Sequence, residues 1–216
     1  MSQTMEFRVI ELLFSRMCHD LVGPVGAAVN GVELLEEFGG EMQDEAITLL
    51  GSSARVASRR LRVYRVAYGM AAGAAISSLG DLRALIQEFL DGGKINLEWP
   101  DAKMPSVHVG RHSIKVILNM AICAAETLPR GGTLHLACDQ VGSDLQVTLA
   151  AKGTGARLAE GVADALQLTT PSANLDPRTV QSYFTALICK NFGQGLRVDE
   201  APDAVTMHCR VNPSAE

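Results

Sequence analysis

The sequence predicts an α+β protein in which a long helical hairpin is followed by an α/β sandwich. Up to about residue 75, apolar residues recur at spacings of three and four, which indicates amphipathic helices. Beyond about residue 77, short alternating runs mix with helical segments, which is typical of strands packed beside helices. We therefore expect two domains: a helical hairpin over residues 1–78 and an α/β domain over residues 79–216.

Each arm of the predicted hairpin has its own apolar stripe, and a Phe-Gly-Gly break at residues 38–40 separates the two arms. The first stripe consists of Ile10, Phe14, Met17, Leu21, Val25, Ala28, Val32 and Leu35. The second follows a heptad pattern through Ile47, Leu50, Ala54, Ala57, Leu61, Tyr64, Tyr68 and Ala71. Two helices cannot cover stripes this wide by themselves. We therefore expect a homodimer in which two hairpins form a four-helix bundle.

The α/β domain is predicted from alternation and capping signals. The expected elements are a helix from an N-cap at Asp81 to Leu90, a strand at 95–99, a helix at 108–128, strands at 134–138 and 145–149 around the Gly142-Ser143 turn, a helix from an N-cap at Asp176 to about Gly193, and strands near Val198 and at 205–211. Strands that follow strands, with helices on one side, favour an α+β arrangement.

Composition excludes several classes of function. The chain has 216 residues and a formal net charge of -5, which argues against a broad basic surface for nucleic acid or anionic lipid. No apolar run is as long as a membrane span, and Arg8 and Glu11 interrupt the N-terminal apolar stretch, unlike a signal peptide. The five cysteines are scattered without a CxxC motif, which favours free thiols and a cytoplasmic protein.

One histidine of the first helix lies off its apolar stripe. His19 is about 200° around the helix from both Met17 and Leu21, so we expect it to point towards solvent. Gly23 and Gly26 share its face, and each lowers helix stability by about 1 kcal/mol relative to alanine. Pro24 lies nearby, and a proline inside a helix lowers its stability by about 3 kcal/mol. Because the chain carries these residues despite their cost, we expect this face of the helix to be a bare surface on which another protein docks. The residues expected to bind that partner are Ser15, Arg16, Val22, Gly23 and Gly26.

The chemistry of this group suits phosphoryl transfer. A histidine is largely neutral at cellular pH and offers a nucleophilic ring nitrogen. Asp20 could accept a hydrogen bond from the other ring nitrogen and fix the tautomer, and Arg16 could contact phosphate oxygens. We assign His19 and Asp20 as the candidate catalytic residues. The alternative is a solvated histidine on a surface helix.

Three segments resemble histidine kinases. Residues 18–25 (Cys-His-Asp-Leu-Val-Gly-Pro-Val) resemble the phosphoacceptor box of the kinase dimerisation domain. Residues 116–121 and 129–133 resemble the asparagine box and the following turn of the kinase ATP-binding domain. Two kinase features are missing. Ala151 stands where the kinases carry the acid that recognises adenine, and residues 181–187 contain no glycine where a phosphate-binding loop is expected. Asn119 remains, either as a magnesium ligand or as a polar residue inside the domain.

A kinase-like chain without an ATP site is similar to the ChpT-type histidine phosphotransferases of alphaproteobacterial phosphorelays. This resemblance implies that His19 takes a phosphoryl group from an aspartyl phosphate on the receiver domain of a hybrid kinase. It then passes the group to an aspartate of a response regulator. The second domain would be a degenerate kinase ATP-binding domain, and no cofactor is expected because Mg²⁺ belongs to the receiver. Two alternatives are an active histidine kinase and a noncatalytic dimeric scaffold for signalling proteins.

Two further groups of side chains have spacings that could indicate a binding site. His108 and His112 have a metal-capable spacing, but no acidic or cysteine partner lies at a matching spacing, so we expect no metal site. Arg55, Arg59 and Arg62 form a basic stripe on the second helix. This stripe is either a solvated face or a docking surface for an acidic receiver.

Overall fold

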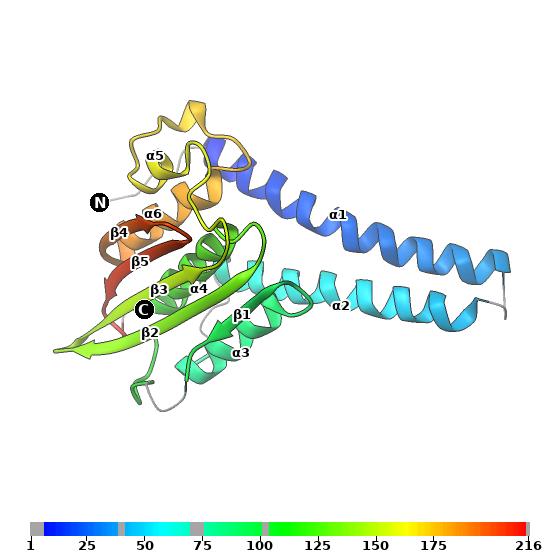
Figure 1. Cartoon of the computed structure of the whole chain (residues 1–216), viewed down its shortest axis with the longest axis horizontal. Coiled ribbons are helices and arrows are strands. Elements are labelled where there is room, and N and C mark those ends of the chain that lie inside the picture. Colours follow the sequence, from blue (N-terminus) through cyan, green and yellow to red (C-terminus); the bar gives the residue numbers. More distant parts are fainter. Residues whose placement is uncertain (1–6, 39–41, 70–75, 101–103, 215–216) are drawn as a thin grey trace.

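The hairpin is present and projects from one end of the molecule (Figure 1). The computed structural model describes residues 7–38, 42–69, 76–100 and 104–214. Helix α1 spans Phe7–Phe38 and helix α2 spans Gln43–Ala67, and they pack side by side. The second helix was expected to continue to about residue 75; α2 instead ends at Ala67, and the predicted stripe residue Ala71 lies outside the described residues, as does the Gly39-Gly40 part of the loop.

Close packing of α1 and α2 depends on Gly31. A Cβ at this position would lie 3.1 Å from the carbonyl oxygen of Ala46 and 3.1 Å from the backbone nitrogen of Leu50. The two helix backbones can approach this closely because glycine has no side chain. This glycine therefore fixes the spacing of the hairpin near its tip.

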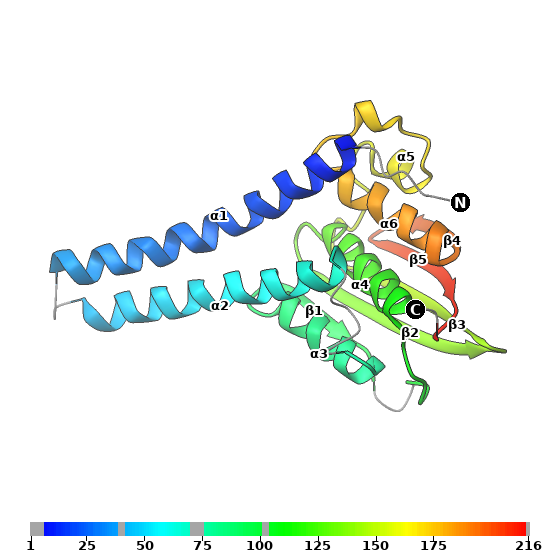
Figure 2. The same cartoon turned by 180° about the vertical axis from the view of Figure 1, so that it is seen from behind.

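The α/β domain is a five-stranded sheet with helices on one face (Figures 1 and 2). Its elements are α3 (Leu79–Leu90), β1 (Ile95–Glu98), α4 (Arg111–Glu126), β2 (Gly132–Val141), β3 (Asp144–Lys152), α5 (Val162–Leu166), α6 (Val180–Phe192), β4 (Gly193–Ala201) and β5 (Ala204–Val211). The strand order is β1-β2-β3-β5-β4, in which β1 and β2 are parallel and the other pairs antiparallel. The predicted α+β class is confirmed.

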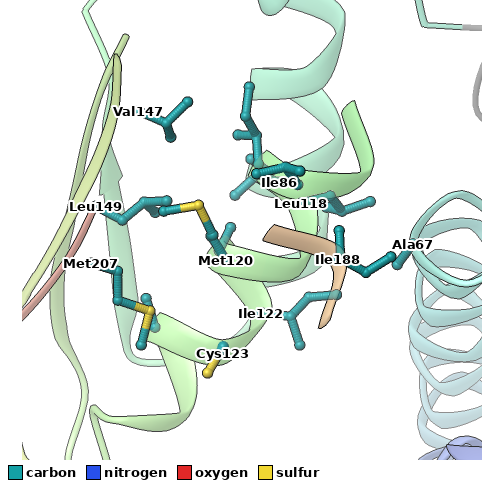
Figure 3. Close-up of a cluster of buried hydrophobic side chains, with 14 of the residues drawn as sticks. Ala67, Ile86, Leu118, Met120, Ile122, Cys123, Val147, Leu149, Ile188 and Met207 are labelled. Carbon is teal, nitrogen blue, oxygen red and sulfur yellow. The ribbon is translucent and has the colours of Figure 1, made fainter. Parts of the chain in front are cut away.

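Alternation along the strands explains why the sheet has one covered face. In β3 and β5, the residues that face the helices are fully buried, and their neighbours in sequence are half-exposed. Figure 3 shows Val147, Leu149 and Met207 from the sheet on one side of α4, with Ala67 of α2 on the other. Helix α4 is therefore the centre of the core, and it joins the sheet to the base of the hairpin.

Helix starts differ from the sequence predictions at two places. Helix α3 is capped by Ser78, whose side chain accepts a hydrogen bond from the Asp81 backbone N–H while the Asp81 carboxylate accepts one from the Ser78 backbone N–H. Asp81 is therefore the third helical residue of a capping box and not the N-cap. Asp176 accepts from the backbone N–H groups of Arg178 and Thr179, but α6 begins only at Val180. Asp176 closes the turn that precedes the helix.

Other differences concern short elements. Helix α4 is shorter than the expected span of residues 108–128, and neither α5 nor the 3₁₀ turn at Ser172–Asn174 was predicted. Five residues are too few to show helical periodicity, so α5 carries no recognisable pattern.

The hairpin and the α/β domain share a single buried core. Residues from the base of the hairpin belong to the same hydrophobic cluster as α4, α6 and the sheet; they are Val9, Leu12, Leu13, Val63, Tyr64, Val66 and Ala67. Two ion pairs add to this contact, between Arg59 and Asp91 and between Arg62 and Glu88. Two residues of the basic stripe are therefore engaged within the chain, whereas Arg55 is exposed.

Two negative findings apply to the described residues. None of the helices there is both long and apolar enough to cross a membrane. The described part of the chain also holds no group of three or more His, Cys, Asp or Glu residues arranged to bind a metal ion. His112, one of the two histidines with a metal-capable spacing, stacks its ring on Phe192 instead, with ring centroids 3.9 Å apart.

Candidate functional site

The central residue of the candidate site is His19, on the outward face of α1. Its side chain is 89% exposed, as its position off the apolar stripe predicts. Met17, two residues earlier, packs against the buried core instead. The helix thus keeps the imidazole accessible to another protein while its opposite face holds the hairpin to the rest of the molecule.

Asp20 lies beside the histidine ring. Its Oδ1 is 3.4 Å from Nδ1 of His19, and its Oδ2 accepts a hydrogen bond from the hydroxyl of Tyr64 in α2. An ionised carboxylate can only accept hydrogen bonds, so this contact places the ring proton on Nδ1. The lone pair then lies on Nε2, the nitrogen farther from Asp20. Asp20 therefore has the geometry to select the tautomer.

The backbone of Asp20 is also held from α2. Pro24 has no N–H, so the carbonyl oxygen of Asp20 lacks its partner within α1. Arg60 donates a hydrogen bond to this oxygen. Arg60 and Tyr64 are four residues apart and thus share one face of α2. Both the carbonyl and the carboxylate of Asp20 are fixed by that face.

Four of the predicted partner-binding residues surround His19 on the open surface of α1. Ser15, Val22, Gly23 and Gly26 are exposed, and Val22 retains 69% of its accessible surface. Apart from the backbone of its own helix turn, a Cβ built on Gly23 or Gly26 would meet no atom within 4 Å. Packing within the chain therefore gives no reason for glycine at either position, unlike Gly31.

Arg16 is placed differently from the other four. Its guanidinium forms an ion pair with Glu126 at the end of α4 and donates to the carbonyl oxygen of Pro177 at 3.2 Å. The side chain is only 17% exposed. The α/β domain thus engages the arginine that we expected to contact phosphate oxygens. In this structure Arg16 joins the hairpin to the α/β domain.

The kinase-like asparagine has a structural environment. Asn119 is fully buried, and its Nδ2 donates to the carbonyl oxygens of Ala67 at 3.1 Å and Lys115 at 2.8 Å. Its Oδ1 accepts from Nε2 of Gln181 at 3.1 Å. Both polar atoms of the side chain are already hydrogen bonded within the protein. Of the two readings of Asn119, the geometry favours the polar residue inside the domain.

The two places where kinase features are missing are also part of the fold. Ala151 is fully buried within β3, between β2 and β5. Two residues later, Gly153 has a local reason to be glycine, because a Cβ there would overlap the carbonyl group of Gly131. Residues 181–187, at the place of the kinase phosphate-binding loop, form part of α6, and Gln181, Ser182 and Thr185 are buried.

Sequence reasoning missed Tyr64 and Arg60. The heptad position of Tyr64 predicts a core residue, and its ring is indeed buried. Its hydroxyl, however, donates a hydrogen bond to the carboxylate of Asp20. One signal was available: Pro24 leaves a carbonyl without a partner, and a long basic side chain on the facing helix is suited to reach it.

Comparisons with known proteins agree with this geometry. Residues 79–204 match the family described as the histidine phosphotransferase C-terminal domain. The chain is 33% identical over 188 residues to the protein phosphotransferase ChpT of Brucella abortus (strain 2308), covering 87% of this chain and 88% of that protein. A solved bacterial phosphotransferase superimposes with a TM-score of 0.80 and 28% identity, covering 96% of this chain and 98% of the other. The chain therefore belongs to the histidine phosphotransferase family.

Proposed function

We propose that His19 is the phosphoacceptor through which this phosphotransferase moves a phosphoryl group between receiver domains. The observation that carries the proposal is the exposed imidazole of His19, with Nδ1 facing Asp20 and Nε2 free. The donor is an aspartyl phosphate on the receiver of a hybrid kinase, and the acceptor is an aspartate on a response regulator. Family membership supports histidine phosphotransfer in a phosphorelay.

Each half of the relay is a single displacement at phosphorus. The Nε2 lone pair attacks the phosphorus atom, an N–P bond forms, and the bond from phosphorus to the aspartyl oxygen breaks. The aspartate leaves as a carboxylate, and the proton on Nδ1 stays in place, hydrogen bonded to Asp20. The second half reverses these changes on the next receiver. The Mg²⁺ that assists the transfer belongs to the receiver, and this chain supplies position and charge.

The receiver docks on the open face of α1. Ser15, Val22, Gly23 and Gly26 lie on the side of the helix that carries His19, and neither glycine presents a side chain. A partner backbone can therefore come within contact distance of α1 beside the phosphoacceptor. The exposed Val22 provides apolar area for this contact.

The transfer does not use ATP and needs no cofactor on this chain. Both polar atoms of the Asn119 side chain are hydrogen bonded, to Ala67, Lys115 and Gln181. The buried Ala151 has no carboxylate that could bind adenine. Residues 181–187 belong to α6 and contain no glycine, so a helix stands where the kinases carry a glycine-rich loop that approaches the phosphates. These observations favour a phosphotransferase over an active kinase.

The protein acts as a homodimer. An apolar groove runs along both helices of the hairpin; it is lined by Pro24, Val25, Ala28, Val29, Val32, Leu50, Ala54, Ala57, Ser58 and Leu61. Val25 and Leu61 keep 50% and 51% of their accessible surface in the single chain. A second hairpin would cover this groove and complete a four-helix bundle. All five cysteines are free, four of them buried, which supports a reducing cytoplasmic location.

The direct test measures acid-labile radiolabel on the protein after mixing it with receiver domains phosphorylated by labelled acetyl phosphate. We expect the wild type and His108→Ala, a change at an exposed histidine elsewhere, to accept label. His19→Ala should accept none while keeping the wild-type helicity. Labelling of His19→Ala at the wild-type rate would refute His19 as the phosphoacceptor. Absence of label from the wild type with every receiver would favour the scaffold alternative.

A further inference from the structure

We infer that Tyr64 is a positioning residue for phosphoryl transfer: it holds Asp20, which in turn fixes the tautomer and orientation of the His19 ring. We also infer that the α/β domain holds Tyr64 in place for this task. The inference rests on the proposed function of His19 and extends it to residues that never touch the phosphoryl group.

The first step is the contact between Tyr64 and Asp20. Tyr64 is 4% exposed, and its hydroxyl donates to Oδ2 of Asp20 while Oδ1 faces Nδ1 of His19. Burial, reinforced by the hydrogen bond to Asp20, raises the pKa of Tyr64 well above its ordinary value. The hydroxyl therefore remains protonated and donates at any physiological pH. A donor on one carboxylate oxygen leaves the other oriented towards the histidine.

The second step is the support of the Tyr64 ring. It stacks on Tyr68 with ring centroids 5.3 Å apart and an interplanar angle of 13°. Tyr68 in turn meets Phe184 of α6 edge-on, at 5.6 Å and 74°. The hydroxyl of Tyr68 donates to Oε1 of Gln181 at 2.6 Å. The ring that holds Asp20 thus packs on Tyr68, which α6 in turn contacts through Phe184 and Gln181.

The third step connects the contacts of Tyr68 with α6 to helix α4. Gln181 donates from Nε2 to Oδ1 of Asn119 at 3.1 Å, and Nδ2 of Asn119 donates to the carbonyl oxygen of Ala67 at 3.1 Å. Both Gln181 and Asn119 are fully buried. The hydrogen bonds thus return to the last residue of α2, one turn beyond Tyr64. Asn119, at the position resembling a kinase asparagine box, anchors the helix that supports the phosphoacceptor.

This chain of contacts matters because, among the described residues, only Asp20 is in hydrogen-bonding contact with the imidazole of His19. His19 is 89% exposed, and the described contact of its ring is with Asp20. In-line attack requires the Nε2 lone pair at a defined position, and small misplacements slow such reactions severely. Loss of the Tyr64 hydroxyl frees the Asp20 carboxylate to rotate. We expect about a 10-fold loss of rate, comparable to removing an outer partner that orients a reactive histidine.

The experiment uses phosphoramidate, a small phosphodonor that transfers its phosphoryl group to histidine and releases ammonia, so that receiver docking plays no part. Tyr64→Phe keeps the stacked ring and removes only the hydroxyl. Tyr183→Phe, at the third tyrosine of the chain, is the matched control. We expect Tyr64→Phe to react about 10-fold more slowly and Tyr183→Phe to react at the wild-type rate.

A spectroscopic measurement separates positioning from general loss of structure. Nitrogen NMR of the labelled His19 ring reports which nitrogen carries the proton. We expect mostly Nδ1–H in the wild type and a larger share of Nε2–H in Tyr64→Phe. Tyr68→Phe, which retains the ring but cuts the link to Gln181, should shift the tautomer in the same direction by a smaller amount. It also provides the test if Tyr64→Phe does not fold.

Three outcomes overturn the inference. The first is a wild-type rate in Tyr64→Phe; the second is a slower rate with unchanged tautomer populations, which indicates a structural role only. The third is an additional loss when Tyr64→Phe is combined with Asp20→Ala, because Tyr64 is inferred to act through Asp20. Each leaves His19 as the phosphoacceptor. Labelling of His19→Ala would instead reject the proposed function itself.

Discussion

Arg60 donates a hydrogen bond to the backbone carbonyl oxygen of Asp20. Within α1 this oxygen would ordinarily accept from the residue four positions later, which is Pro24 and has no N–H. A side chain of α2 therefore replaces a backbone donor of α1. The substitution links the two helices at the turn that carries His19, so the proline interruption is balanced by a contact between helices.

This relationship predicts the effect of removing the guanidinium. Arg60→Met keeps an unbranched side chain but leaves the part-buried carbonyl without a donor, so the free energy of unfolding should fall by about 1–3 kcal/mol. Arg55→Met, at an exposed position of the same helix, should change it by less than about 0.5 kcal/mol. Urea denaturation followed by circular dichroism measures both variants. Equal losses would show that the hydrogen bond to Asp20 contributes nothing of its own.

The glycines of α1 give a second prediction, because they occupy two different environments. Leucine at Gly26 meets open space and a better helix former replaces glycine, so stability should hold or rise by up to about 1 kcal/mol. Transfer from a phosphorylated receiver should nevertheless fall, since the side chain occupies the proposed docking surface. Leucine at Gly31 would collide with Ala46 and Leu50 and should destabilise the hairpin. Undiminished transfer by Gly26→Leu would place the receiver elsewhere.

The apolar groove of the hairpin predicts the oligomeric state. Leu61→Glu puts a charge into the groove and should dissociate or unfold the dimer, because a buried unpaired charge is very costly. Val141→Glu, on a residue of β2 with comparable exposure, should leave the dimer intact. Light scattering over a concentration series reads out both. A wild-type protein that is monomeric throughout, with full helicity, would contradict the four-helix bundle.

Glu126 predicts a dependence of stability on pH. Burial raises the pKa of its carboxyl to about 7 from an ordinary value of 4.5; the Arg16 guanidinium opposes this shift and Asp20 reinforces it. Between these values the folded chain binds more protons at Glu126 than the unfolded chain, so stability falls as pH rises. The favourable contribution is complete below about pH 4.5 and lost above about pH 7.

Glu126→Gln should remove this part of the slope, which denaturation midpoints across that window would reveal. Glu160→Gln, at an exposed glutamate, controls for the loss of one negative charge. A Glu126→Gln protein with the same pH slope as the wild type would show that other groups account for it.

Nucleotide binding is the fifth prediction. Calorimetric titration with ATP or ADP and Mg²⁺ should give no measurable heat of binding, with the ATP-binding domain of an active histidine kinase as the positive control. The reason is the engagement of Asn119 within the core and the helical conformation of residues 181–187. Micromolar affinity would instead favour the kinase alternative.

Local patterns were enough to predict the helical hairpin, the α+β class and the exposure of His19. The spacing of apolar residues in α1 and the alternation in β3 are local signals, so they survive without knowledge of the tertiary structure. The start of α3 could not be predicted from local patterns, because Ser78 and Asp81 are both good caps and only the geometry shows that Ser78 is the N-cap.

The parts of the site that depend on distant residues could not be predicted. A tyrosine at a heptad position indicates core, and nothing in the sequence around Tyr64 shows that Asp20 lies within reach of its hydroxyl, 44 positions away in sequence. Arg16 was expected to face a phosphoryl group, yet its nearest acid in space is Glu126, 110 positions away. The first pairing arises when α1 and α2 pack together, and the second arises when the hairpin docks on the α/β domain.

The shared core at the base of the hairpin makes folding cooperative at one end of the molecule only. Buried hairpin residues of the common cluster lie at the start of α1 and the end of α2, while the tip packs mainly on itself around Gly31. Opening of the tip thus breaks few contacts, whereas opening of the base disrupts the whole core. Amide hydrogens should accordingly exchange faster towards the tip in a single chain. A second hairpin would slow that exchange, and the four-helix bundle would form after the rest of the protein has folded.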